Sequence, residues 1–418
     1  MAAERIGLVY VVGTYPLLTT TFVDREIELL HGLGADVRIV AMRRPAADTP
    51  FSSLQRSLSG AVTYLLPVVW SELFAAHVFY LLRSPRRYLG TLGYLLSRPH
   101  PSVRARFKTL LHFGEGVLAA HMVQRQPFEE LHAHFADRAA TIALVAGRLL
   151  GKPYSLSIHA GADVFVGPVL LREKVGEARH VVACTATVKG QVAAIAGADL
   201  GRKISLIFHG LDLARYIPGR GPASDPPVIL AVGQLKERKG FALLIRACRL
   251  LRDQGRRFRC LIVGEGPQRR ELEELIRAAS LEDLVELCGG FPHEEVVEQY
   301  RRATLFVLPC IRTREGDVDG IPNAVAEAMA MELPVVSTDL PAIRELVSDG
   351  VNGVLVSEGH PAALAAAMGR LLDRPDLREA LGRQGRRRVL ESFDVETNVR
   401  RFAETLWPRW FPALEVAS

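Results

Sequence analysis

Apolar and polar positions alternate along this chain in a way that predicts strands and helices in regular succession. Residues 6–12 (IGLVYVV) form an uninterrupted apolar run typical of a buried strand, and residues 22–34 follow with helical spacing and end at a glycine. A second apolar run at 36–42 completes a strand–helix–strand unit. Because such alternation builds parallel sheets, we expect ligands at the carboxyl ends of the strands. Further strands are expected at 130–135, 153–160, 180–185 and 204–210, with a helix at 137–151.

The same alternation begins again after residues 218–227, a stretch rich in proline and glycine. Each new apolar run is again followed by a helix of ordinary length, which predicts a second sheet of the same kind. Strands are expected at 228–233, 259–264, 284–289, 304–309 and 334–338, with helices near 240–254, 267–280, 293–303 and 322–331.

Length supports a division into two domains, since 418 residues exceed what one hydrophobic core usually serves. We predict an α/β protein of two doubly wound, Rossmann-like domains that face a central cleft, the usual place for a ligand. The first domain is expected at 1–212 with a helical insertion at about 61–115, the second at 213–390, and a closing helix within 391–418 that packs back on the first.

Cysteine usage and the amino-terminal residues indicate the compartment. Five cysteines are widely spaced and form no C-x-x-C pair, which argues against a disulfide framework or a cysteine zinc site and favours a reducing cytosol. The first residues run straight into an apolar strand and lack the basic start and cleavage site of a signal peptide. We therefore expect a cytoplasmic protein.

Positive charge is concentrated in the predicted insertion at 61–115, although the whole chain carries only +6. No acidic residue lies between Glu72 and Glu115, and seven lysines and arginines there alternate with large apolar residues. This mixture suits an anionic membrane surface, which would make the protein peripheral on the inner membrane face. A helical insertion whose apolar side covers its own domain explains the pattern equally well. We expect no membrane span, because Pro67 and His77 interrupt the apolar run, and no nucleic-acid partner, because no binding motif accompanies the charge.

Residues 319–327 (DGIPNAVAE) place two acids around a loop that is broken by glycine and proline and leads into a helix. Loop amides and the positive end of the helix favour a diphosphate, while the carboxylates of Asp319 and Glu327 can accept hydrogen bonds from hydroxyls. The segment therefore suits a sugar nucleotide. Alternatively the helix simply packs, and its glycine and proline are ordinary features of a helix start. The loop amides concerned are those of Gly320, Ile321 and Asn323.

Histidines and a glycine near strand ends are further candidates. His132 and His134 alternate on one strand face, a spacing that can ligate a metal, but no third ligand is evident nearby and we expect an acceptor-site or core role. His159 ends another strand, where a lone histidine is more often structural. Gly13 closes the first strand and would let a phosphate approach the backbone.

Several strings in a fixed order carry a resemblance to a known family. The first half contains YPLLTTTFVDREI, LHAHFADRAA and SIHAGADVF, and IFHGLDLARYIP leads into the second half. There follow AVGQLKERKGFALLIRA, LIVGEGPQRRELEELI and DGIPNAVAEAMAMELPVVSTDL. In this order, over nearly its whole length, the chain resembles the retaining family-4 glycosyltransferases of the GT-B fold, in particular bacterial enzymes of exopolysaccharide and colanic-acid biosynthesis.

The resemblance implies roles for individual residues. Lys239 matches the lysine that neutralises the departing diphosphate, and Glu327 matches the glutamate that binds the donor ribose. Asp319 and His159 correspond to groups that bind the transferred sugar, although the family usually has glutamate at the first of these positions. Gln234 stands where the family usually has arginine, so one positive charge is missing from the donor-binding residues. The acceptor-side positions are Thr14, His132, His134 and Asp163.

Two short patterns suggest cofactors that we do not expect. Asp317-Val318-Asp319 matches the D-x-D tripeptide that holds a divalent ion in the other major glycosyltransferase fold, but such a tripeptide often occurs by chance. Gly264-Glu265-Gly266 follows a strand, yet position 269 is arginine where the dinucleotide fingerprint needs glycine. We predict no required metal and no cofactor besides the sugar nucleotide.

The expected reaction is transfer of a hexose from a nucleoside diphosphate sugar to a hydroxyl of a saccharide or polyprenyl-linked acceptor, with retention at the anomeric carbon. Two alternatives remain open. A sugar-nucleotide epimerase of similar fold would convert its substrate without an acceptor. A non-catalytic binding protein would hold the sugar nucleotide without turnover.

Overall fold

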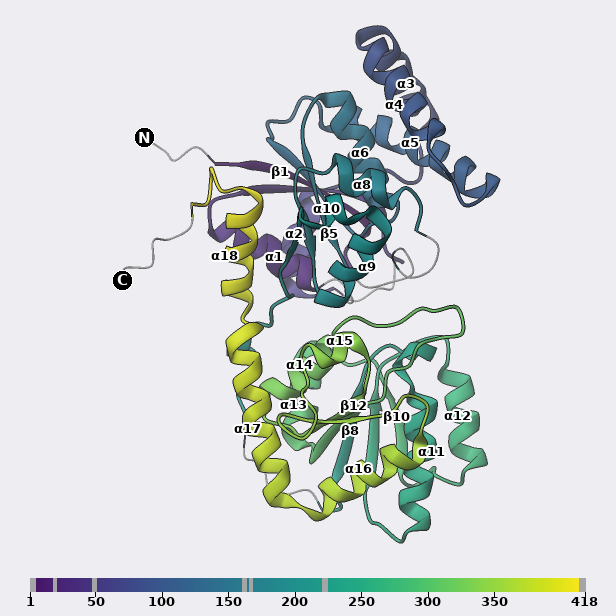
Figure 1. Ribbon diagram of the computed structural model, residues 1–418, viewed down its shortest axis with the longest axis vertical. Helices are drawn as coiled ribbons and strands as arrows, with labels where there is room; N and C mark the ends of the chain where they lie inside the picture. Colours follow the sequence, from purple (N-terminus) through teal and green to yellow (C-terminus); the bar gives the residue numbers. More distant parts are fainter. Residues whose placement is uncertain are drawn as a thin grey trace. The chain divides into compact units, whose positions relative to one another are not determined.

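The computed structural model describes residues 5–17, 21–46, 51–159, 164, 168–219 and 225–412 (Figure 1). The chain forms two compact units: unit 1 comprises 1–209 and 396–418, and unit 2 comprises 210–395. Within the described ranges, no helix combines the length and the hydropathy that a membrane span requires.

Unit 1 is built on a parallel sheet. Its described strands lie in the order β3-β2-β1-β4-β5-β6-β7. The direction of winding reverses between β1 and β4, which pair directly, so the carboxyl ends of these strands form a topological switch point, where α/β proteins bind ligands. The strands are β1 (Gly7–Thr14), β2 (Asp36–Arg43), β3 (Val62–Tyr64), β4 (Glu130–His134), β5 (Tyr154–Ile158), β6 (Val181–Ala183) and β7 (Ile204–Leu206).

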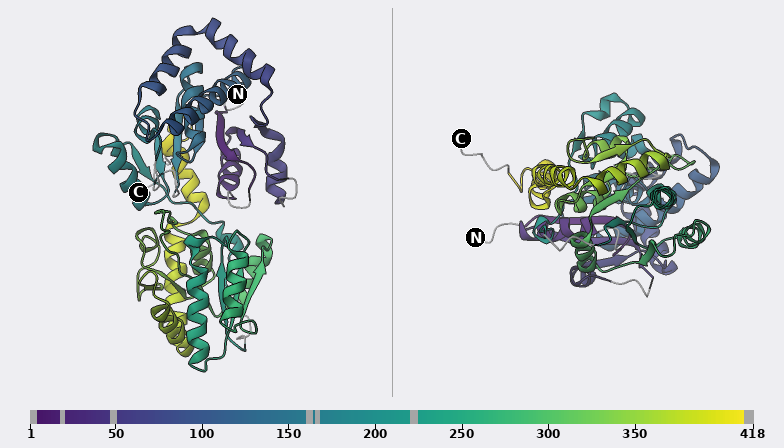
Figure 2. Two further views of the ribbon diagram at one scale, coloured as in Figure 1. Left: turned by 90° about the vertical axis from the view of Figure 1, so that its right-hand side faces the viewer. Right: turned by 90° about the horizontal axis from the view of Figure 1, so that it is seen from below.

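Helices cover this sheet in layers. α6 (Arg138–Leu150) is buried along nearly its whole length, because RAATIALVAGRLL is apolar on most of its faces. α5 (Val103–Val123) packs against α6, and α3 (Trp70–Arg83) and α4 (Pro85–Ser97) form an outer layer over both (Figures 1 and 2). The other helices of unit 1 are α1 (Thr21–Gly32), α2 (Ser53–Leu58), α8 (Leu171–Glu177), α9 (Ala186–Ala196) and α10 (Ala198–Gly201).

The closing helix α18 (Val395–Leu406) contributes to the core of unit 1. The ring of Phe402 lies 5.3 Å from the ring of His132, and the ring of Trp407 lies 6.0 Å from it. Both aromatic side chains are buried, so the end of the described chain covers polar residues of β4.

Unit 2 repeats the architecture with a second parallel sheet. The order of its described strands is β10-β9-β8-β11-β12-β13, and winding reverses between β8 and β11. Its strands are β8 (Val228–Val232), β9 (Arg259–Val263), β10 (Val285–Gly289), β11 (Leu305–Leu308), β12 (Val335–Thr338) and β13 (Val354–Val356). Its helices are α11 (Phe241–Asp253), α12 (Arg269–Ala278), α13 (His293–Arg302), α14 (Asn323–Ala330), α15 (Pro341–Arg344), α16 (Pro361–Asp373) and α17 (Pro375–Ser392).

The predicted α/β organisation with two parallel sheets is confirmed. The short edge strands β3 and β13 were not predicted, and neither were α16 and α17. Pairing with β2 and β12 defines these two strands.

Candidate functional site

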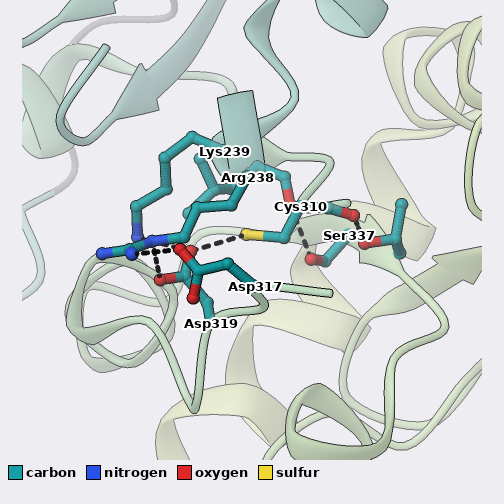
Figure 3. Close-up of polar contacts among 8 residues, drawn as sticks. Arg238, Lys239, Cys310, Asp317, Asp319 and Ser337 are labelled. Atoms are coloured by element: carbon teal, nitrogen blue, oxygen red, sulfur yellow. Dashed lines mark hydrogen bonds and ion pairs between the residues drawn. The ribbon is translucent and has the colours of Figure 1, made fainter. Parts of the chain in front are cut away.

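Charged side chains gather at the carboxyl ends of β8 and β11, the switch point of unit 2 (Figure 3). Nζ of Lys239 lies 2.8 Å from Oδ2 of Asp319, and Nε of Arg238 lies 2.9 Å from Oδ1 of the same carboxylate. Nη1 of Arg238 also contacts Oδ2 of Asp317 at 2.9 Å. The Cys310 thiol donates to Asp319 at 3.5 Å. Two residues that were predicted separately, Lys239 and Asp319, are therefore direct partners.

A close approach of two loops positions Lys239. The 3-10 helix η4 (Glu237–Lys239) ends at Gly240, whose φ is 71°. A Cβ at Gly240 would lie 1.8 Å from the carbonyl oxygen of Pro309, directly after β11. Only glycine allows both this backbone conformation and this contact, so Gly240 brings the loop after β8 against the loop after β11.

We expect Gly240→Ala to lower the free energy of unfolding by about 3 kcal/mol, because it combines a left-handed backbone with a clash against Pro309. Gly255→Ala is the matched control. Gly255 has a φ of 73°, but a Cβ there would meet no heavy atom within 4 Å, so we expect a loss of only about 1 kcal/mol. Urea denaturation measures both variants, and equal losses would contradict the importance of the close approach.

Both cations of this cluster remain charged at neutral pH. Burial, the largest single effect, acts to lower the pKa of Lys239, but the charge of Asp319, its hydrogen bond to the ammonium and the nearby Cys310 together outweigh burial, so the pKa is raised. Burial also acts to lower the pKa of Arg238, but the charges of Asp319 and Asp317 and the hydrogen bonds to both carboxylates together raise it. Two carboxylates thus balance two cations. Gln234, half-buried in the loop after β8, adds a neutral amide, and its side chain makes no hydrogen bond to any described residue.

The loop after Asp319 presents backbone donors. Helix α14 follows Pro322, and no side chain caps its first turn. Among the described residues, no oxygen accepts a hydrogen bond from the backbone N–H of Gly320, Ile321 or Asn323. Since the first N–H groups of a helix carry positive potential, this loop is suited to an anion.

Glu327 lies one turn into α14 and is oriented by a tyrosine. The hydroxyl of Tyr300, in α13, donates to Oε2 of Glu327 at 2.8 Å. Burial, together with the charge of Glu327, raises the pKa of Tyr300 and of Tyr216. A carboxylate accepts several hydrogen bonds, so Glu327 retains the capacity to bind ligand hydroxyls.

Unit 1 contains a row of hydrogen-bonded imidazoles next to its own switch point. Nε2 of His134 lies 3.2 Å from Oε1 of Glu26, and Nδ1 of His134 lies 3.1 Å from Nε2 of His159. Nδ1 of His159 in turn lies 2.9 Å from Nε2 of His209. The ring of Phe22 contacts the last two imidazoles at 4.9 and 4.3 Å. The sequence pointed to His134 and His159, whereas Glu26 and His209 were missed, although His209 is the last residue but one of the predicted strand at 204–210.

His132 has the features of a core residue. It is fully buried, and its two ring nitrogens lie 2.8 and 3.0 Å from the hydroxyls of Ser155 and Ser157. The expectation that no third ligand lies near the histidine pair is wrong, because Glu26 from α1 reaches them. Sequence spacing did not reveal this contact, since Glu26 is on a different element.

Two groups of side chains are close enough to share a metal ion. Glu26, His132 and His134 form one, and His159, Cys184 and His209 form the other, with the ligand atoms of each within 4.8 Å of one another. In the first group, a metal would have to replace hydrogen bonds that His132 already makes to serines. The nitrogen and sulfur atoms of the second group are the ligand types that zinc prefers.

The structure gives fewer contacts for the remaining predicted residues than for those of the two clusters above. Gly13 and Thr14 end β1 at the switch point of unit 1, and a Cβ at Gly13 would meet only the terminal methyl of Met42, at 3.7 Å. Asp163 lies outside the described residues. Gly264 has a packing role, because a Cβ there would lie 1.9 Å from the carbonyl oxygen of Gly233.

We expect the imidazole row to make the protein less stable as the pH falls from about 6.5 to about 4. Burial lowers the pKa of His209 to about 4, and burial together with neighbouring imidazoles holds the pKa of His159 well below its ordinary value. In this window the unfolded chain binds protons that the folded chain excludes, so acidification favours unfolding. Urea midpoints across the window measure the effect. His209→Asn should reduce the slope, and an unchanged slope would contradict the assignment.

Comparisons with known proteins identify the family. Residues 215–388 match the family described as glycosyl transferases group 1. WcaL of Salmonella typhimurium, a glycosyltransferase named for colanic acid biosynthesis, is 30% identical over 415 residues, which cover 94% of this chain and 97% of WcaL. The amylovoran biosynthesis glycosyltransferase AmsK of Erwinia amylovora is 39% identical over 170 residues, which cover 40% of this chain and 42% of AmsK.

Solved structures of glycosyltransferases share the fold. A glycosyltransferase from Rickettsia africae superposes with a TM-score of 0.71 at 16% identity, covering 98% of this chain and all of that one. HepE of Anabaena, in complex with UDP-glucose, superposes with a TM-score of 0.72 at 18% identity, covering 96% of this chain and 99% of HepE. With its two parallel Rossmann-like sheets, the chain has the GT-B fold and belongs to the group 1 glycosyltransferases.

Proposed function

We propose that the chain transfers a hexose from a nucleoside diphosphate sugar to a hydroxyl of a saccharide or polyprenyl-linked saccharide, with retention at the anomeric carbon. The cluster at the switch point of unit 2 carries the proposal. It combines a charged lysine, two carboxylates and backbone amides that donate to no oxygen in the described part of the chain, which are the groups that a diphosphate and sugar hydroxyls require. The UDP-glucose in HepE supports this class of donor.

In this proposal the donor site mainly neutralises the charge of the diphosphate and orients the sugar nucleotide. Negative charge grows on the diphosphate as the glycosidic bond breaks, and Lys239 with the amides at the start of α14 stabilises it. Glu327 accepts from ribose hydroxyls, and Asp319 accepts from hydroxyls of the sugar. Arg238 is engaged by two carboxylates, so it compensates only weakly for the neutral Gln234.

Residues of unit 1 are proposed to serve the sugar and the acceptor. His159 would hydrogen-bond the donor sugar, and its position in the row from Glu26 to His209 fixes the orientation of its ring. The proposed acceptor-side residues are Thr14, His134 and Asp163, while His132 supports them from the core. Gly13 would let a phosphate approach the backbone, because a Cβ there would meet only the terminal methyl of Met42.

The reaction is proposed to need no metal ion. The guanidinium of Arg238 contacts both carboxylates of the D-x-D tripeptide, and its positive charge opposes a divalent cation there. Treatment with EDTA should leave the transfer rate unchanged. A rate that falls with EDTA and recovers with added metal would contradict this part of the proposal.

The biological setting is proposed to be the assembly of exopolysaccharide or another surface glycoconjugate, at the inner face of the membrane. The names of WcaL and AmsK support this setting. A carrier-linked acceptor would be presented at a membrane surface, which agrees with the composition of the segment at 61–115.

Two measurements test the proposal. Thermal shift with UDP-, GDP- and ADP-sugars identifies the donor, because a ligand that binds only the folded state raises the midpoint of unfolding. Release of nucleoside diphosphate is then followed with and without oligosaccharide or lipid-linked acceptors. If the chain transfers the sugar, nucleoside diphosphate should be released only when an acceptor is present. Conversion of the donor without an acceptor would indicate an epimerase, and binding without any turnover would indicate a binding protein.

A further inference from the structure

Helices α3, α4 and α5 carry an unusual concentration of exposed apolar side chains. Eleven of the fifteen large apolar residues that are exposed in the described chain lie between Val69 and Leu111. On α3 and α5 they recur at helical spacing, so each of these two helices presents an apolar stripe to solvent, and α4 adds Leu89. On α3 the stripe consists of Trp70, Phe74, Val78, Leu81 and Leu82, and on α5 it consists of Val103, Phe107, Leu110 and Leu111.

Packing within unit 1 does not account for these stripes. The opposite sides of the same helices are buried, through residues such as Tyr80, Leu95 and Phe113. By contrast, Trp70 is 76% exposed and Phe74 is 71% exposed. Both belong to α3, which lies in the outer layer of unit 1 (Figure 1). The interpretation that the insertion covers its own domain therefore explains one side of the helices and leaves the other side without a partner.

The cations of this surface are exposed, and Arg87 donates to the carbonyl oxygen of Leu149 at the C-terminal end of α6. In the described residues, none of them lies within ion-pair distance of a carboxylate, and no acid occurs between Glu72 and Glu115. Many arginines elsewhere do pair with a carboxylate, as Arg270 does with Glu274 at 3.0 Å. The cations are Arg83, Arg86, Arg87, Arg98, Arg104, Arg106 and Lys108.

We propose that this α3–α5 surface, residues 69–111, docks on a lipid bilayer that contains anionic lipids. The apolar stripes would enter the boundary between headgroups and acyl chains, while the cations contact lipid phosphates. A second copy of the chain is a poor partner, because it would bring two uncompensated positive surfaces together. The inference rests on the proposed function only for the role of the docking surface, which would hold the enzyme close to a lipid-linked acceptor.

Vesicle flotation of the full-length chain tests the charges. The chain should float with vesicles of phosphatidylglycerol and phosphatidylethanolamine and remain in solution with phosphatidylcholine vesicles. Combined replacement of Arg104, Arg106 and Lys108 by glutamine should weaken binding to anionic vesicles about 100-fold, since each cation near the surface contributes a factor of about five. The matched control removes three positive charges elsewhere, through Arg270→Gln, Arg301→Gln and Arg302→Gln, and should bind like the wild type.

A second pair of variants tests the apolar stripe. Trp70→Ser with Phe74→Ser should abolish flotation, whereas Val351→Ser with Leu390→Ser, which removes exposed apolar residues of unit 2, should have no effect. Absence of flotation by the wild type, or equal losses in the test and control variants, would overturn the proposal. A lipid-independent dimer that the Trp70 and Phe74 variant dissociates would overturn it as well.

These assays contain neither donor nor acceptor, so they are independent of sugar transfer. Thermal shift with the sugar nucleotide, applied to the same variants, reports on the donor site and on folding. Variants that lose flotation but keep the shift support the docking surface. A chain that floats but binds no sugar nucleotide would contradict the proposed function and leave membrane docking intact.

Discussion

Lys239→Ala is expected to lower kcat for sugar transfer by about 100- to 1,000-fold, with a smaller change in donor affinity. The ammonium of Lys239 is kept charged by Asp319, 2.8 Å away, in a largely buried position. Charge develops on the diphosphate only as the bond to the sugar breaks, so removing the cation raises the barrier more than it weakens binding of the ground state. Initial rates of acceptor-dependent nucleotide release at saturating donor measure kcat.

Lys236→Ala is the matched control for this variant. Lys236 belongs to the same loop, but within the described residues its side chain forms no ion pair, and its removal should leave kcat within about threefold of the wild type. In the Lys239 variant Arg238 still pairs with Asp319, so the unfolding midpoint should change little. If kcat of Lys239→Ala stays near that of the wild type, another group neutralises the leaving diphosphate.

Glu327→Ala is expected to weaken donor binding by about 100-fold, because two charge-assisted hydrogen bonds to the ribose would be lost. The carboxylate is already oriented by Tyr300, which reduces the cost of ordering it on binding. Isothermal titration calorimetry with the donor identified by thermal shift measures the loss.

A donor that carries a 2′-deoxyribose makes the test specific. It should bind the wild type more weakly than the normal donor, whereas Glu327→Ala should no longer distinguish the two. Tyr300→Phe removes the orienting hydrogen bond, along with a longer contact to the carbonyl oxygen of Ala324 at 3.3 Å, and we expect a loss of about fivefold. Glu294→Ala, on the exposed side of α13, should bind normally. A Glu327 variant that still discriminates between the two donors would exclude a ribose contact.

Much of the architecture was predictable because it depends on local periodicity. The apolar runs at 228–233 and 304–309 correspond to β8 and β11, and the helix expected at 322–331 is α14. Such elements need only a short stretch of sequence to specify them. The edge strands β3 and β13 were not predicted, and hydrogen bonds to β2 and β12 define them.

The candidate site was predictable as a set of residues but not as a set of contacts. Lys239 and Asp319 were each assigned to the donor, yet their direct pairing was not expected. The pairing of Arg238 with both Asp317 and Asp319 was not expected either. In unit 1 the approach of Glu26 to the histidines depends on how α1 packs, which sequence spacing does not encode.

By itself the sequence determined the alternation of strands and helices, the acids around the start of α14 and the unbalanced positive charge at 61–115. These properties are visible there because each depends on neighbouring residues or on composition. Only the tertiary structure decided which distant groups meet at the switch points and which apolar side chains of α3 and α5 remain exposed. Strand order and helix packing set those distances, because they bring together residues that lie far apart along the chain.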